Sequence, residues 1–158
     1  MPPTTGLIIG RFCPPHLGHS HLIDTAAAEV DRLTVIVFAK AGESVPGELR
    51  AGWLGELHPA VTVVHVPTTL VTDWDDPDTW ARWIALIRSV VPKGPDVVFS
   101  SEPYGDEVAR RLGARHVCVD AGRHEVPISA TAIRSDPLAH LDRLAPPVRA
   151  WYLALRGD

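Results

Sequence analysis

The sequence predicts an α/β fold, a three-layer arrangement in which helices cover both faces of a five-stranded parallel sheet. Short apolar runs rich in valine and isoleucine recur along the chain, and such runs are typical of buried parallel strands. They occupy residues 7–9, 33–38, 61–66, 95–101 and 116–120. Each run is followed by a stretch with helical spacing, and this alternation of strands and helices favours a parallel sheet.

The composition suits one domain, and we expect residues 1–158 to form it. Fifteen basic and nineteen acidic residues give a net charge of −4, whereas nucleic-acid binders usually carry a basic face, so nucleic acid is not an expected partner. The two cysteines do not suggest a disulfide framework. The chain shows no signal-peptide pattern and no apolar run of membrane-spanning length. We therefore expect a soluble cytoplasmic protein that does not bind membranes.

The first strand leads into an open turn and then a helix. It ends at Gly10, and Pro14 and Pro15 hold the next segment open, because proline cannot continue a strand ladder and disfavours helix in the residue before it. A helix is predicted from about Leu17. The turn therefore lies at the carboxyl end of a strand, where open α/β sheets bind ligands.

A phosphate site is predicted at the start of that helix. His16 and His19 are one helical turn apart, and Arg11 precedes them. The first N–H groups of a helix have no intrahelical partner, and Gly18 lacks a Cβ that would keep a ligand from the backbone. A zinc site is the alternative, but His-x-x-His lacks the third ligand of such sites.

The next two strand–helix units carry polar residues near the same edge of the sheet. Lys40 follows the second strand, either facing a ligand or as a solvated loop lysine. A short helix is predicted over 48–57, with Arg50 exposed in its first turn. Asp76 before Pro77 marks the start of another helix, since proline suits the first helical turn. In that helix Trp83 is expected to be a core residue, while the choice between Trp80 and Trp83 as a stacking surface for an acceptor ring is left open.

The last units provide a second candidate anion site. Ser100 and Ser101 end the fourth strand on the ligand side, and a helix follows over 106–112. Near the C-terminus, Ser129 can cap a helix in which Thr131 and Arg134 share one face, so a helix N-terminus, two hydroxyls and an arginine converge. The tail from residue 137 carries two short helical stretches that suggest packing or an oligomer surface.

Two motifs carry a family resemblance. Residues 10–19 read Gly-Arg-Phe-x-Pro-x-His-x-Gly-His, and residues 128–134 read Ile-Ser-x-Thr-x-x-Arg. Together they resemble the HxGH nucleotidyltransferase superfamily. The Gly-Arg-Phe opening is more like its nicotinamide-mononucleotide adenylyltransferases, of the archaeal type and of the bacterial bifunctional NAD-regulator type. Cys13 and Pro15 replace residues that are more often polar and phenylalanine in those relatives.

The resemblance implies a Rossmann-like fold and an enzyme that moves AMP from ATP to nicotinamide mononucleotide, with Mg²⁺ accompanying ATP and no metal ligand from the protein. It places His16 and His19 on the ATP phosphates, with His19 at the transition state, and Arg11 and Arg134 on the β- and γ-phosphates. The residues that it assigns to nucleotide binding are Gly10, Phe12, Gly18, Arg50, Asp73, Trp80, Ser101, Ser129 and Thr131. An Asp-x-x-Arg at Asp120 and Arg123 also matches.

Alternatives remain open at this point. The first is a sibling transferase that acts on another phosphorylated acceptor such as phosphopantetheine, or that uses CTP. The second is a domain that binds ATP or NAD without catalysis. The chain has neither Gly-x-Gly-x-x-Gly nor a Walker lysine loop, which argues against a dinucleotide oxidoreductase and a P-loop kinase. Relatives are often multimers, so a homo-oligomer is compatible, and the choice between nicotinamide and nicotinic acid mononucleotide is left open.

Overall fold

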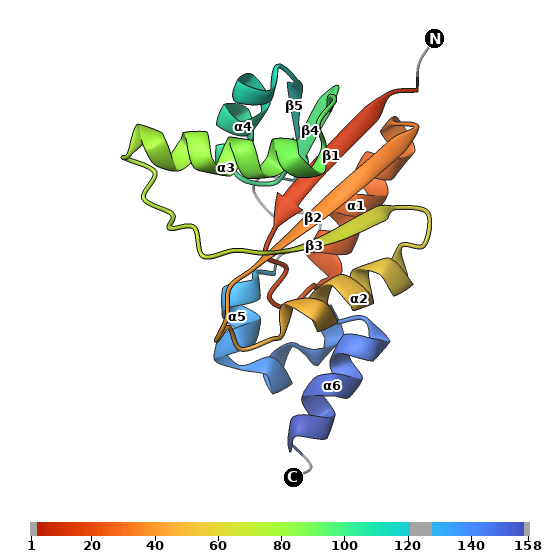
Figure 1. The fold of residues 1–158 in the computed structure, drawn as a ribbon. Coiled ribbons are helices and arrows are strands. Elements are labelled where there is room, and N and C mark those ends of the chain that lie inside the picture. The colour runs from red at the N-terminus through yellow and green to blue at the C-terminus, as the bar shows by residue number, and fades with distance from the viewer. Residues whose placement is uncertain (1–2, 121–127, 157–158) are drawn as a thin grey trace.

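The structure is a computed structural model that describes residues 3–120 and 128–156. Its centre is a five-stranded, all-parallel sheet with the strand order β3-β2-β1-β4-β5 (Figure 1). The predicted sheet is confirmed, although the last two strands are shorter than expected. The strands are β1 (Thr5–Gly10), β2 (Arg32–Ala39), β3 (Thr62–Pro67), β4 (Val97–Ser100) and β5 (Arg115–Cys118).

The central strand β1 creates the place for a site. It pairs with β2 along its whole length, from Thr5 to Gly10, and with β4 through Gly6 and Leu7. The chain progresses from β1 outward through β2 to β3, and then crosses back to β4 on the other side of β1. The carboxyl ends of β1 and β4 therefore flank a topological switch point, where α/β sheets leave a crevice for ligands.

Helices cover both faces of the sheet, as predicted. Leu7 and Ile8 show the division, because neighbouring residues of a strand point to opposite faces. Ile8 packs in a core with α1 and α2, and Leu7 packs in a second core with α3 and α4. The helices are α1 (Leu17–Glu29), α2 (Gly47–Leu57), α3 (Pro77–Val90), α4 (Tyr104–Leu112), α5 (Ala130–Ser135) and α6 (Pro146–Arg156), with a 3₁₀ helix η1 (Pro137–Arg143).

Local signals place the helix ends where the sequence suggested. The Asp76 carboxylate accepts the Asp78 N–H at the start of α3, with Pro77 in the first turn. Gly113 ends α4 in the left-handed conformation, with φ 71°. The Ser129 hydroxyl accepts the Ala132 N–H at the start of α5. No helix in the described ranges is both long and apolar enough to cross a membrane.

The C-terminal elements pack on the loop that follows β1. A third core contains Cys13 from that loop together with seven other buried residues: Val45, Trp53, Ile128, Ile133, Leu144, Val148 and Tyr152. The packing role expected for the tail is thus confirmed. This third core holds α5 beside the first loop, although the two motifs are more than a hundred residues apart in the chain.

Candidate functional site

A cavity of about 510 Å³ opens at the switch point. The end of β1 and the following loop form one wall, and residues 100–104 after β4 form another. The start of α5 and the first turns of α3 complete it. Both predicted anion motifs therefore line one cavity, together with the tryptophans of α3.

The two histidines cap the helix on which they stand. His16 precedes α1, and its Nδ1 accepts the N–H of Gly18 at 3.0 Å. The Nδ1 of His19 accepts the N–H of His16 at 3.1 Å, and the two rings stack with centroids 3.8 Å apart. A nitrogen that accepts an N–H carries no proton, so this hydrogen-bond pattern assigns the ring proton to Nε2 in both residues. Each imidazole of the pair thus has its donor on the nitrogen remote from the cap.

Gly18 has a different role from the one expected. Its N–H donates to Nδ1 of His16, so one of the N–H groups at the helix start is already paired within the protein. A Cβ at residue 18 would lie 2.8 Å from Cε1 of His16, which is closer than real Cβ contacts. The glycine is required because the imidazole of His16 folds back onto the helix start.

Gly10 and Phe12 line the same cavity. Phe12 is 3% exposed and has φ 51°, a conformation that is uncommon for a bulky residue. Its ring meets the ring of His19 edge-on, with centroids 4.7 Å apart. The phenylalanine therefore acts as an apolar support for the histidine pair.

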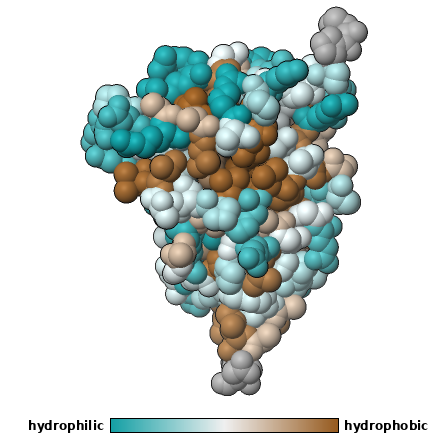
Figure 2. Space-filling view, in the orientation of Figure 1, coloured by the Kyte–Doolittle hydropathy of each residue, from teal (hydrophilic) through white to brown (hydrophobic). Residues whose placement is uncertain are grey.

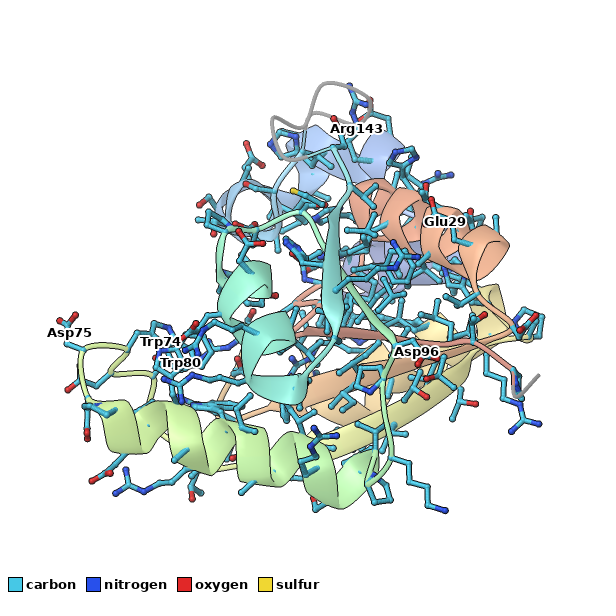
Figure 3. The ribbon with its side chains drawn as sticks, turned by 90° about the horizontal axis from the view of Figure 1, so that it is seen from above. Glu29, Trp74, Asp75, Trp80, Asp96 and Arg143 are labelled. Carbon is cyan, nitrogen blue, oxygen red and sulfur yellow. The ribbon has the colours of Figure 1, made fainter. Side chains whose placement is uncertain are left out.

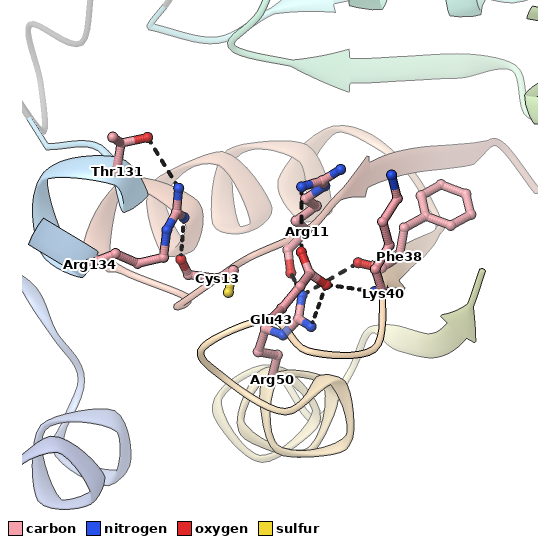
Figure 4. Close-up of polar contacts among 8 residues, drawn as sticks. All are labelled: Arg11, Cys13, Phe38, Lys40, Glu43, Arg50, Thr131 and Arg134. Carbon is pink, nitrogen blue, oxygen red and sulfur yellow. Dashed lines mark hydrogen bonds and ion pairs between the residues drawn. The ribbon is translucent and has the colours of Figure 1, made fainter. Parts of the chain in front are cut away.

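Arg11 lies at the cavity wall but is paired with a carboxylate. Its Nη1 is 3.4 Å from Oε2 of Glu43, and half of its side chain is exposed. The other oxygen of Glu43 accepts the N–H of Lys40 at 2.6 Å and lies 3.0 Å from Nη2 of Arg50. Figure 4 shows the carboxylate of Glu43 between the two guanidinium groups. Burial raises the pKa of Glu43, but the Lys40 N–H and the two arginines outweigh it, so the pKa is lowered.

Arg50 is neither exposed nor at the cavity. Its side chain is fully buried, so the expected exposed arginine is wrong. Its Nη1 donates to the carbonyl oxygens of Arg11 at 2.8 Å and Phe38 at 3.4 Å (Figure 4). Arg50 does not line the cavity, and its contacts are to the backbone and to Glu43. In this structure Arg50 supports the loop that carries Arg11.

Arg134 joins the second motif to the first. Its Nη1 donates to the carbonyl of Cys13 at 2.6 Å, and its Nη2 lies 3.4 Å from the Thr131 hydroxyl (Figure 4). Ser129, Thr131 and Arg134 all line the cavity, as expected. The guanidinium of Arg134 is thus held in place by a backbone carbonyl of the first loop.

The tryptophans occupy one end of the cavity. Trp83 is 7% exposed and donates its indole N–H to the Val71 carbonyl at 3.0 Å, which confirms it as a core residue. Trp80 is half-buried and lines the cavity, and the guanidinium of Arg111 lies 5.2 Å from its ring centroid. Asp73 does not line the cavity; its carboxylate accepts the Asp75 N–H at 3.3 Å.

A hydrogen-bond network behind the wall at 100–104 was not anticipated. The Ser100 hydroxyl lies 2.7 Å from Nε2 of His116, whose Nδ1 lies 2.6 Å from a carboxylate oxygen of Asp106. A Cβ at Gly105 would lie 2.1 Å from the Ser100 hydroxyl, so only glycine fits between the two partners. Ser100 was expected at the ligand-side end of the fourth strand, but no local signal pairs it with His116.

The rest of that wall is also held by the backbone around it. The Ser101 hydroxyl donates to the Val119 carbonyl at 2.5 Å and lines the cavity. The Tyr104 hydroxyl donates to the Ile9 carbonyl at 3.1 Å. Burial, together with the charge of Glu102, raises the pKa of Tyr104 to about 12, so the phenol stays a neutral donor. These bonds tie the start of α4 to the end of β1.

Two further features of the sequence remain to be compared with the structure, the metal-ligating side chains and Arg123. Within residues 3–120 and 128–156, no three His, Cys, Asp or Glu side chains are grouped so that they could hold a metal ion. Arg123 lies outside the described residues.

Comparison with known proteins supports the family resemblance of the two motifs. No protein-family model matches the chain. The trifunctional NAD biosynthesis/regulator protein NadR of Escherichia coli (strain K12) is 27% identical over 169 residues, 95% of this chain and 41% of NadR. A nicotinamide-nucleotide adenylyltransferase of Halobacterium salinarum (strain ATCC 29341 / DSM 671 / R1) is 36% identical over 103 residues, 63% of this chain and 56% of that protein.

The chain resembles nicotinamide-nucleotide adenylyltransferases. It spans only about half, or less, of the length of these curated relatives. Among solved structures, NadR protein in complex with NAD and AMP-PNP is similar with a TM-score of 0.68 and 20% identity, over 90% of this chain and 44% of that one. The nucleotidyltransferase fold that the motifs implied is therefore confirmed.

Proposed function

We propose that this protein is a nucleotidyltransferase that moves AMP from ATP to nicotinamide mononucleotide, with NAD and pyrophosphate as products. The observation that carries the proposal is the stacked pair of His16 and His19. Their Nδ1 atoms are occupied by the helix cap, and the cavity they line also receives Arg11 and Arg134. Similarity to adenylyltransferases at 31–36% identity supports the same reaction.

The reaction needs positioning and charge stabilisation more than proton transfer. An oxygen of the acceptor's phosphate attacks the α-phosphorus of ATP, the bond from that phosphorus to the bridging oxygen breaks, and pyrophosphate leaves. The attacking phosphate is already anionic, so no strong general base is required. Donors aimed at the developing charge on phosphorus lower the barrier, and a positioned donor typically contributes about 10²–10³ in kcat.

The residues divide this work. His16 and His19 donate Nε2–H groups to the phosphates, with His19 at the α-phosphate in the transition state. Arg11 and Arg134 hold the β- and γ-phosphates, and the hydroxyls of Ser129 and Thr131 assist. Mg²⁺ would accompany ATP, with phosphate oxygens and water as its main ligands, and would neutralise charge on the triphosphate.

The acceptor subsite lies at the tryptophan end of the cavity. Trp80 lines it, half-buried, and an indole face suits a planar pyridine ring. This support applies to nicotinamide and nicotinic acid mononucleotides alike. Neither phosphopantetheine nor glycerol phosphate has an aromatic ring that would need such a surface.

An assay with the purified chain tests the proposal. ATP and Mg²⁺ are supplied with one of four acceptors: nicotinamide mononucleotide, nicotinic acid mononucleotide, phosphopantetheine or glycerol phosphate. We expect a dinucleotide product and pyrophosphate with a pyridine mononucleotide only. Product from another acceptor would point to a sibling transferase, and ATP binding without product from any acceptor would point to a non-catalytic domain. The cytoplasmic location, the single domain and the homo-oligomer stay predictions.

A further inference from the structure

A second tryptophan covers the ring that the proposed acceptor would use. Trp74 lies in the connection between β3 and α3, and its ring centroid is 4.5 Å from that of Trp80, with the planes tilted by 38°. Figure 3 shows the two indoles side by side at the start of α3. Trp74 also lines the cavity. A pyridine ring that stacks on the part of Trp80 that Trp74 covers would therefore compete with a group already present.

The Trp80 ring packs against the second core and also contacts Trp74 and Arg111, and these last two differ in how firmly they are held. The guanidinium of Arg111 lies 5.2 Å from the ring centroid, and its Nε is paired with Glu107 at 3.0 Å. Arg111 also stands on a regular helix, α4. Trp74 is 45% exposed and stands on an irregular connection. Of the two, the indole can leave at the lower cost.

The neighbouring tryptophan provides an internal comparison. Trp83 donates its indole N–H to the Val71 carbonyl and is 7% exposed, so it is anchored by a hydrogen bond and by burial. No hydrogen bond between the Trp74 indole and any residue of the described chain is found. Its ring lies against the rings of Trp80 and, with centroids 6.0 Å apart, Trp83. Trp74 is therefore held less firmly than Trp83.

Hydrogen bonds hold the backbone next to Trp74 more firmly than they hold its side chain. Asp73 accepts the Asp75 N–H with its carboxylate and the Asp76 N–H with its carbonyl. Asp76 in turn caps α3. This turn presents the indole from a fixed point, so that rotation of the side chain is sufficient to uncover Trp80. It also gives Asp73 a role outside the cavity.

We propose that Trp74 is a resident ring that occupies the acceptor's stacking place on Trp80 and is displaced when the acceptor binds. This inference rests on the proposed function, because it assumes an acceptor with an aromatic ring. Apolar side chains lie on this face below the start of α3, as Figure 2 shows, so a displaced indole has apolar surface to move onto. Displacement should favour acceptors that have an aromatic ring, because a ligand without a ring cannot replace the contact between Trp74 and Trp80 that is lost.

The test is the affinity of nicotinamide mononucleotide for the wild-type chain and for Trp74→Ala, measured calorimetrically with Mg²⁺ and a non-hydrolysable ATP analogue present. Removing a competing aromatic pair should tighten acceptor binding about two- to tenfold. Val71→Ala is the matched control, because that side chain is 62% exposed on the same connection and does not line the cavity. We expect it to leave the affinity unchanged.

A second readout follows the ring itself. The chain has five tryptophans, so 5-fluorotryptophan labelling gives five ¹⁹F signals, and loss of one in Trp74→Phe assigns residue 74. Addition of the mononucleotide should move that signal towards its solvent-exposed position. Weaker acceptor binding in Trp74→Ala, or an unmoved Trp74 signal in a wild-type chain that binds the acceptor, overturns the displacement. Absence of acceptor binding in both proteins, with the ATP analogue still bound, overturns the proposed function as well.

Discussion

The sharpest prediction concerns Arg50, because the family resemblance and the geometry lead to different outcomes. As a phosphate ligand, Arg50 would affect the KM for ATP and leave folding intact. In the structure it is fully buried, donates to the carbonyls of Arg11 and Phe38, and pairs with Glu43. We therefore expect Arg50→Met to lower the free energy of unfolding first, and nucleotide binding only through the loop.

The magnitude follows from what the substitution leaves behind. Removing one partner of a buried ion pair typically costs about 3–5 kcal/mol, because the other charge stays buried. Glu43 retains the Lys40 N–H and Arg11, and its side chain is 16% exposed, which reduces this cost. The buried Nε of Arg50 has no hydrogen-bond partner, so its removal relieves about 1–3 kcal/mol of desolvation. The net expectation is a loss of about 2–3 kcal/mol.

Urea unfolding followed by circular dichroism measures this loss. Arg82→Met is the matched control: an exposed arginine on α3, for which a change within about 0.5 kcal/mol is expected. A loss below about 1 kcal/mol for Arg50→Met, together with a large rise in the KM for ATP, would refute the structural role and restore the phosphate contact. An unchanged m value, the slope of unfolding free energy against urea concentration, would show that the variant unfolds from the same compact state.

Three further predictions use the same site. His19→Ala should lower kcat about a hundredfold or more with an unchanged melting temperature, because in the proposed function it removes a donor at the α-phosphate; a near-normal kcat would exclude that role. Trp80→Ala should raise the KM for the mononucleotide, by a factor equivalent to about 1–3 kcal/mol of lost stacking, and leave the KM for ATP unchanged; equal effects on both would make Trp80 a core residue. The lowered pKa of Glu43 means that its ionised form stabilises the fold above its usual value of 4.5, and that this contribution is lost as pH falls through the folded-state pKa. In Glu43→Gln the unfolding free energy should therefore decline less steeply below about pH 4.5 than in the wild type. The same decline in both proteins would contradict this prediction.

Most of the fold was predictable, because it depends on signals within a few residues. The apolar runs predicted all five strands, and the Asp76–Pro77 pair and Ser129 predicted helix starts that the structure confirms. Capping and strand burial are local effects, so the sequence shows them directly. The fourth strand lacks the predicted Pro95, Asp96 and Ser101, and the fifth ends at Cys118, two residues before Asp120, whose φ of 48° is not a strand conformation.

The site was predictable as a set of motifs but not as a set of contacts. His16, His19 and Arg134 line one cavity because both motifs lie at the same edge of the sheet. Their spacing could not reveal that the His16 ring folds onto Gly18. It also could not show that Arg134 is held by the Cys13 carbonyl, because that contact joins residues 121 positions apart.

The sequence by itself determined the order of strands and helices, the helix starts at Asp76 and Ser129, and the two motifs that are predicted to bind phosphate, because each depends on neighbours in the chain. The tertiary structure decided which side chains are available to a ligand. It buried Arg50, paired Arg11 with Glu43 and placed Trp74 on Trp80. Arginine 11 and glutamate 43 are 32 residues apart, and a charge is paired or free only according to what the folded chain brings next to it.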